Sequence, residues 1–379
     1  MAATPDRAAY LPTLDGWRGI AILMVVMGHA VKPQFCSVVP EPGWCRFALL
    51  GGHGVALFFA LSGFLITSRL IGEYERNGRI SLRAFYVRRA FRILPAAFTL
   101  LLVLSALGAA GVLPIAPQEI VSSALFFRNY IPLFLSDGGH GFYTALFWSL
   151  AIEEHFYLIW PLLLIISLRR GVSGRVAVGL AIVIAVWRRL EGNYLWLQRA
   201  LDLPQYQFYF RTDTRLDALL WGCTLALLLR DARTRVLVKR ALKPAIWVLL
   251  PALYIAGIAL EWRGVLWHTL LAPPLIVGTM LYPHAPAGRV LELAPLRWVG
   301  RISYSLYLWH ALVMPQVAGA VAWPVMQSLP LNVPVAFILA AGSYYLVEKP
   351  MISWGRRLVD RRAQIRYNSR LQSSTREMV

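Results

Sequence analysis

An arginine and a histidine share one face of the apolar stretch GWRGIAILMVVMGHAV, residues 16–31. Eleven positions separate Arg18 from His29, and at about 100° per residue a helix then returns to within roughly 20° of the same face. The two side chains lie about 16 Å apart along the axis, near half of a ~30 Å hydrocarbon core. We interpret His29 as a candidate base at membrane depth and Arg18 as a contact for an anionic ligand. The alternatives are a core histidine bonded to a backbone carbonyl and an arginine that only anchors the helix.

Two adjacent carboxylates lie in WSLAIEEHFYLIWP. Glu153 and Glu154 point about 100° apart on a helix, so at most one faces squarely into a cavity and the other pairs with a base or caps the first turn. We take them as candidate catalytic carboxylates, one of which orients the imidazole of His29. If the helix begins at Ser149, the pair instead stabilises the positive end of the helix dipole.

Arginines crowd the segment FYVRRAFRILP. Arg88 and Arg92 are like charges four residues apart, which destabilises a helix unless an anion lies between them. Lipid headgroups supply one such anion, and the phosphates of a nucleotide-like donor supply another. We expect Arg88 and Arg92 to join Arg18 in donor binding and Arg89 to anchor the chain to lipid.

Two further polar groups are candidate substrate contacts. The segment RTDTRLDALLWG carries Asp213, Arg215 and Asp217, and the segment RISYSLYLWH ends with His310. The two aspartates are like charges four residues apart, so we expect an arginine or a hydroxyl-rich ligand to bridge them. The aromatic residues of the second segment are typical of a membrane-interface belt.

The composition identifies the elements that must position these side chains. Hydrophobic residues make up 58% of the 379 positions and charged residues only 15%, against ~25% charge in ordinary soluble domains. This predicts an all-α polytopic membrane protein. Apolar runs predict about ten transmembrane helices, near residues 16–31, 51–68, 93–113, 148–168, 176–187, 215–229, 245–260, 265–283, 302–320 and 333–347.

The basic residues predict the orientation of this bundle. An even number of helices places both termini on one side of the membrane. If that side is the cytoplasm, the inward segments, counted with Arg18 and Arg92, hold 29 of the 38 Lys and Arg residues. This is the positive-inside pattern, so the net charge of +19 is explained by orientation and anionic lipid, and no nucleic-acid partner is needed.

Small residues and cysteines carry less information. Gly54, Ser62 and Gly63 are typical of close helix packing. Cys36 and Cys45 share a predicted outward loop and form either a disulfide or two free thiols. No Cys/His cluster has metal-ligand spacing, so no metal is expected. The first helix is interrupted by its histidine and followed by no good cleavage site, so we expect a membrane span and not a signal peptide.

Seven motifs in order resemble one family across nearly the whole chain. They are the arginine-x10-histidine pattern, LFFALSGFLI, RRAFRILP, WSLAIEEHFYLIWP, TRLDALLWG, SYSLYLWH and YYLVEKP. The chain resembles the membrane-bound acyltransferase family typified by bacterial O-antigen and exopolysaccharide O-acetyltransferases, acyltransferase type three. The resemblance implies a ten-helix inner-membrane enzyme that takes an acyl group, usually acetyl, from cytoplasmic acyl-CoA. It also implies that the family's arginine, histidine and acidic motif correspond to Arg18, His29, Glu153 and Glu154.

The sequence thus predicts a single membrane acyltransferase domain over residues 1–379, with a basic cytoplasmic tail from about 350. Many family members carry a further domain after the last helix, and this chain ends 29 residues after YYLVEKP, so we expect the stand-alone form. Acyl-CoA is the expected co-substrate and a glycan, lipid-linked sugar or other small hydroxyl compound the acceptor. His29 acts either as the base or as an acyl carrier. The rival prediction is a proton- or anion-coupled transporter, which buried ionisable groups would also suit.

Overall fold

The computed structural model describes residues 11–35, 50–132, 141–202, 204–243, 246–259, 265–314 and 322–361. Helices joined by turns make up these ranges, and the described residues contain no strand, which confirms the all-α prediction for this part of the chain. The α-helices are α1 (Pro12–Phe35), α2 (Leu50–Asn77), α3 (Leu82–Ala109), α4 (Pro117–Ala124), α5 (Phe142–Ala145), α6 (Phe147–Arg169), α7 (Ser173–Tyr194), α8 (Trp196–Ala200), α9 (Asp217–Leu228), α10 (Ala232–Ala241), α11 (Ile246–Ala259), α12 (Val265–Leu281), α13 (Pro286–Leu291), α14 (Ala294–Val313) and α15 (Asn332–Ser343). The short elements are the 3-10 helices η2 (Arg128–Tyr130), η3 (Gln205–Phe210) and η4 (Thr212–Thr214), and the π-helical turn η6 (Tyr344–Glu348), which continues α15.

Each of the ten predicted segments coincides with a helix over most of its described length. Among the described residues, four helices are long and apolar enough to cross a membrane: Gly51–Asn77, Leu82–Ala109, Phe142–Arg169 and Asn332–Arg361. Ten membrane crossings and cytoplasmic termini therefore stay predictions.

Several helix boundaries differ clearly from the prediction: α2 continues to Asn77 and α7 to Tyr194, past the predicted ends at 68 and 187, and α3 and α14 begin early. The third helix begins at Leu82 and not near residue 93, because Ser81 caps it by accepting a hydrogen bond from the Ala84 amide. Helix α14 begins at Ala294 and ends at Val313, whereas the apolar run predicts a segment over 302–320. In both cases arginine-rich first turns extend a helix beyond its apolar run.

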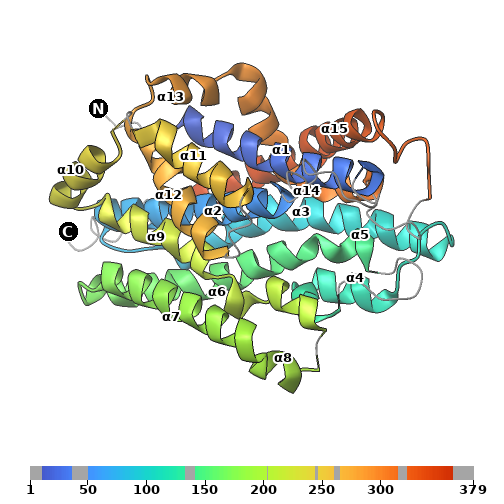
Figure 1. The fold of residues 1–379 in the computed structure, drawn as a ribbon, viewed down its shortest axis with the longest axis horizontal. Helices are drawn as coiled ribbons and strands as arrows, with labels where there is room; N and C mark the ends of the chain where they lie inside the picture. Colours follow the sequence, from blue (N-terminus) through green and yellow to red (C-terminus); the bar gives the residue numbers. More distant parts are fainter. Residues whose placement is uncertain are drawn as a thin grey trace, which may run out of the picture.

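The long helices lie roughly along the horizontal axis of Figure 1, with α10 at the left end and α4 at the right. Helix α1 packs against α2 and α14, and α2 packs against α9. Glycines permit the close approaches: a Cβ on Gly63 would lie 1.9 Å from the Leu219 carbonyl oxygen, and one on Gly54 would lie 2.4 Å from that of Ala21. The packing interpretation of these two glycines is confirmed.

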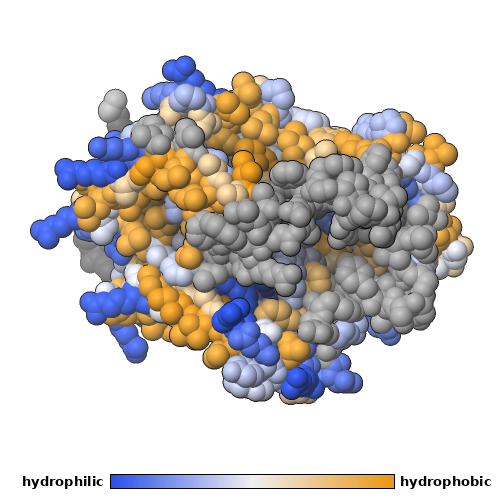
Figure 2. Space-filling model, viewed as in Figure 1, coloured by the Kyte–Doolittle hydropathy of each residue, from blue (hydrophilic) through white to orange (hydrophobic). Residues whose placement is uncertain are grey.

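Apolar side chains cover much of the outer surface. Leu102 on α3, Leu158 on α6 and Leu346 on η6 are 72%, 59% and 79% exposed. In Figure 2 hydrophobic residues dominate the visible face outside the grey atoms, and hydrophilic residues gather at the left end, where α10 lies, and along the lower edge. Such a surface suits hydrocarbon better than water.

Candidate active site

A cavity of about 1970 Å³ lies between α1, α2, α3, α6, α14 and the helix that continues α15. Three carboxylates and nine arginines line it, so its charge is strongly positive. The arginines, which we call the cavity arginines, are Arg18, Arg69, Arg76, Arg79, Arg83, Arg88, Arg89, Arg92 and Arg356. The structure thus brings together all three residues predicted to bind the donor.

The carboxylate of Glu73 shows how the cavity holds an anion near the start of α3. Glu73 accepts a hydrogen bond from the Ser81 amide (2.8 Å) at the start of α3, and its other oxygen lies 3.5 Å from Arg88 Nη2. The positive end of a helix dipole and a guanidinium therefore act on the same carboxylate. The prediction for Arg89 is wrong: its guanidinium lies over the Tyr157 ring (4.9 Å), inside the cavity and not toward lipid.

The carboxylate of Glu153 lies deeper in the same cavity. It accepts hydrogen bonds from the hydroxyls of Ser62 (2.7 Å) and Tyr157 (2.9 Å). Glu154 does not line the cavity, as expected for adjacent helical residues that point about 100° apart. The structural alternative for this pair is wrong, because α6 begins at Phe147 and both glutamates lie beyond its first turn.

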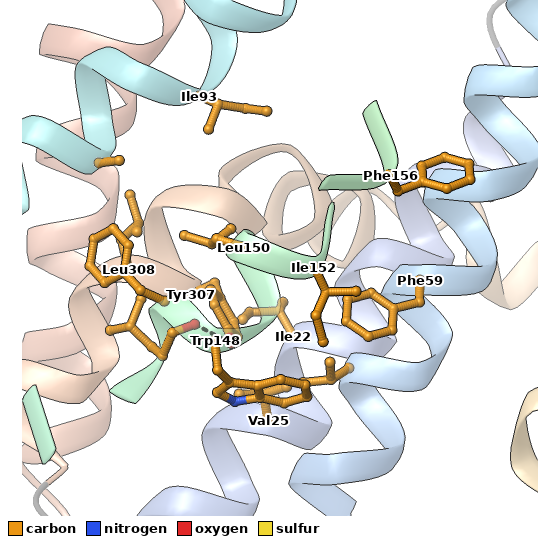
Figure 3. Packing of buried hydrophobic residues seen from close by; sticks show 14 of the residues in the cluster. Ile22, Val25, Phe59, Ile93, Trp148, Leu150, Ile152, Phe156, Tyr307 and Leu308 are labelled. Carbon is orange, nitrogen blue, oxygen red and sulfur yellow. Dashed lines mark hydrogen bonds between the residues drawn. The ribbon is translucent and has the colours of Figure 1, made fainter. Parts of the chain in front are cut away.

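A row of polar side chains continues from the cavity wall. Ser149 and Tyr307 both line the cavity, and their hydroxyls are 2.6 Å apart. The Tyr307 ring lies 5.6 Å from that of His310, and the rings of His310 and His29 are 4.8 Å apart. Figure 3 shows Tyr307 in the core cluster with Val25 of α1, which precedes His29 by one helical turn. The structure therefore brings two histidines from different helices together next to a residue of the cavity wall, although neither histidine is among the described residues that line the cavity.

Hydrogen bonds fix the orientation of both imidazoles. His29 Nδ1 lies 2.8 Å from the Val25 carbonyl oxygen, and His310 Nδ1 lies 2.6 Å from that of Tyr307. A carbonyl only accepts, so Nδ1 carries the proton in each neutral ring and Nε2 is the basic nitrogen. The Val25 carbonyl thus takes the orienting role that was predicted for a glutamate.

Helix α2 gives the distance between the glutamate and His29. Gly51 packs against His29, since a Cβ on this glycine would lie 3.6 Å from the imidazole Cε1, whereas Ser62 bonds to Glu153. Eleven residues of α2 separate these contacts, about 16 Å of helical rise. Glu153 therefore does not contact His29, and the structure does not unite them as a pair.

The two aspartates of the segment RTDTRLDALLWG have separate arginine partners. Asp213 accepts hydrogen bonds from Trp187 Nε1 (2.7 Å) and Arg211 Nε (3.0 Å). Asp217 forms an ion pair with Arg188 (2.7 Å). Neither Arg211 nor Arg188 therefore bridges the two aspartates, and a bridging hydroxyl-rich ligand stays a prediction. These aspartates build the scaffold around Arg215, which is 1% exposed and lies 4.4 Å from the centroid of the Tyr209 ring.

Sequence reasoning missed several residues of the site. The sequence predicts a packing role for Ser62 and an interface-belt role for Tyr307, whereas both line the cavity, and it gives no role to Tyr157. The available signal was spacing: Tyr157 is four residues from Glu153 and Tyr307 three from His310, so each shares a helix face with a chosen residue. Cys36 and Cys45 lie outside the described residues, and Cys223 is a buried free thiol.

Comparisons with known proteins agree with the motifs. An acyltransferase domain family model matches residues 11–347. The chain is 28% identical to peptidoglycan O-acetyltransferase OatA of Listeria monocytogenes, over 90% of this chain and 56% of that protein. It is 31% identical to the putative peptidoglycan O-acetyltransferase YrhL of Bacillus subtilis, over 94% of this chain and 57% of that protein. It is 30% identical to O-acetyltransferase OatA of Staphylococcus aureus, over 90% of this chain and 57% of that protein.

The chain thus spans little more than half the length of these curated relatives. No solved structure matches it. Because the family model covers most of the chain, the protein belongs to the acyltransferase family that its seven motifs resemble.

Proposed function

We propose that the chain is a membrane-bound O-acyltransferase that moves an acetyl group from cytoplasmic acyl-CoA to a hydroxyl of a cell-envelope glycan. The observation that carries this proposal is one cavity, lined by nine arginines, whose wall reaches the Tyr307 ring beside His310 and His29. The relatives are named O-acetyltransferases, two of them of peptidoglycan, and these names support acetyl as the group and a glycan as the acceptor. Membership of this family favours the enzyme over a transporter.

The cavity suits a large anionic donor. Its volume of about 1970 Å³ exceeds the ~300–1,000 Å³ of typical small-molecule pockets. The cavity arginines supply forked donors for phosphate oxygens, and Val55, Phe58 and Phe59 give its wall an apolar section for an uncharged arm. Arg18, Arg88 and Arg92 would hold the phosphates.

The histidines supply the proton chemistry. Nε2 of His29 takes the proton of the acceptor hydroxyl while the hydroxyl oxygen forms a bond to the acyl carbon. The carbon–sulfur bond of the thioester breaks, and the proton then passes from His29 to the leaving thiolate. If His29 instead carries the acyl group, the same nitrogen is the nucleophile. Both routes need the neutral tautomer that the Val25 carbonyl selects. His310 lies beside the reacting atoms as an acceptor contact or second base.

The surroundings of the site fit a bacterial inner membrane. The positive-inside distribution of lysine and arginine supports cytoplasmic termini and access to the cavity arginines from the cytoplasm. The lipid bilayer, acyl-CoA and the glycan are then the partners of the chain. Glu153 accepts hydrogen bonds from Ser62 on α2 and Tyr157 on α6, and so holds these two helices together at the cavity.

Labelled acetyl-CoA and purified chain in nanodiscs test this proposal. His29→Ala should lower acetyl transfer to peptidoglycan strands by about 10²- to 10⁴-fold, the contribution of a general base, and leave acetyl-CoA affinity unchanged. The matched control is His284→Ala, which removes an exposed histidine. A His29→Ala protein with the turnover of the control would refute the assignment.

A further inference from the structure

A second group of arginines lies where α7, η4 and α9 meet. We call it the outer arginine cluster; it contains Arg188, Arg211, Arg215, Glu191, Asp213 and Asp217. Arg211 pairs with Glu191 (2.7 Å) and with Asp213, while Arg188 pairs with Asp217 (2.7 Å). These contacts use all three carboxylates, and Arg215 receives none of them.

Arg215 is a buried cation without a hydrogen-bond acceptor among the described residues. It is 1% exposed, and its Nε, Nη1 and Nη2 atoms all lack a partner there. Arg188, also buried, has an unpaired Nη2, and the charges of Arg188 and Arg215 repel each other. Buried donors of this kind are costly unless an acceptor reaches them, and an oxyanion is an acceptor that would also offset the repulsion between the two charges.

Aromatic rings hold the Arg215 guanidinium in place. It lies 4.4 Å from the centroid of the Tyr209 ring and 5.9 Å from that of Trp148. Contacts of a guanidinium with ring faces leave its N–H groups available for a forked bond to an oxyanion. The three N–H-bearing nitrogens of Arg215 therefore stay available to a carboxylate or a phosphate.

The outer arginine cluster lies close to the histidine pair. The Tyr209 hydroxyl packs against Gly52, 2.8 Å from where a Cβ on that glycine would lie, and the neighbouring Gly51 packs against His29. Trp148 belongs to the same core cluster as Val25, the residue whose carbonyl orients His29 (Figure 3). The ring that stacks on Arg215 therefore packs against the residue of α2 next to the one that packs against the proposed base.

We propose that Arg215, with Arg188 beside it, binds an oxyanion of the acceptor, so that the enzyme selects an acidic glycan and presents its hydroxyl to His29. This inference rests on the proposed function and names its acceptor class. The phosphates of the donor are held elsewhere, because the cavity arginines do not include Arg215 or Arg188.

Matched acceptors test the inference. The probes are a tetrasaccharide with carboxyethyl ethers as the free acid, its neutral methyl ester, and a phosphorylated tetrasaccharide without carboxylates. Binding and kcat/KM are measured with the full chain in nanodiscs for wild type, Arg215→Gln and the control Arg189→Gln, which removes an exposed neighbouring charge. We expect the wild type and the control to favour an anionic probe over the ester by about 10- to 100-fold, the value of a charge-assisted hydrogen bond.

In Arg215→Gln this preference should fall to about one, through a higher KM for the anionic probe. The better of the two anionic probes identifies carboxylate or phosphate. Equal binding of all three probes by the wild type would overturn the inference, as would an Arg215→Gln protein that loses acid and ester transfer alike while it still binds acetyl-CoA. Direct binding gives the answer even if turnover is absent, so failure of the inference and failure of the proposed function are distinguishable.

Discussion

Replacement of Arg18 by glutamine isolates the contribution of one cavity arginine to donor binding. Arg18 lines the cavity on α1, and the helical rise places it about 16 Å from His29. It is too far away to touch a carbonyl that reacts at His29 but is well placed for a phosphate. Arg18→Gln should therefore weaken acyl-CoA binding, whereas His29→Ala should slow the chemistry and leave binding intact.

The structure sets the size of this effect. A hydrogen bond to a charged group contributes about 1.5–3 kcal/mol. Eight other arginines line the same cavity and take over part of the electrostatic attraction. We therefore expect a loss near the lower limit, about 1.5 kcal/mol, which is roughly a tenfold rise in Kd.

Calorimetry with acetyl-CoA on purified protein in nanodiscs measures this difference. The matched control is Arg357→Gln, because Arg357 is exposed and does not line the cavity although its neighbour Arg356 does. The control should bind acetyl-CoA as the wild type does, and the effect of Arg18→Gln should shrink as salt is raised. If Arg18→Gln binds as tightly as the control, Arg18 is only a helix anchor and the donor site must be centred on Arg88 and Arg92.

Single contacts and the topology carry three further predictions. Ser62→Ala removes a 2.7 Å hydrogen bond to Glu153, and Glu153→Gln removes the negative charge of that side chain. Both variants should purify at normal yield but transfer less acetyl from labelled acetyl-CoA. Gly300→Ala places a Cβ 1.8 Å from a backbone oxygen of α1, which should cost about 3 kcal/mol or more and lower the thermal unfolding midpoint in detergent. A reporter inserted near Pro204 should be periplasmic and one fused to the C-terminal end cytoplasmic; the opposite result at either place contradicts the ten-helix topology.

The sequence predicted helices better than it predicted their ends. Apolar runs of about 15 to 20 residues are a local signal, so the helical segments were found. The ends depend on capping and on neighbouring helices. Ser81 starts α3 well before the apolar run at 93, and the first turns of α14 contain Arg297 and Arg301, which a hydropathy criterion excludes.

For the site, spacing predicted shared faces but not partners. The structure places Arg18, Arg88 and Arg92 in one cavity, as their charge and position suggested. The direction of Arg89 was wrong because its aromatic partner, Tyr157, comes from another helix that is distant in the sequence. The failed pairing of Glu153 with His29 has the same reason. The two residues contact positions of α2 that are eleven residues apart, and only the packing of α2 against α6 and α1 shows this.

Helix α2 relates the two arginine groups to each other. Along it the contacts run from Arg76 in the cavity wall, through Ser62 beside Glu153, to Gly52 beside Tyr209, a separation of 24 residues or about 36 Å of helical rise. That length exceeds the ~30 Å of a hydrocarbon core. A donor held by the cavity arginines and an acceptor held by Arg215 would then approach from opposite faces of the membrane. The acyl group, and not the glycan, would then cross the membrane through the protein. His29 packs against Gly51, the neighbour of Gly52, and would therefore meet the acyl group at the acceptor end of this route.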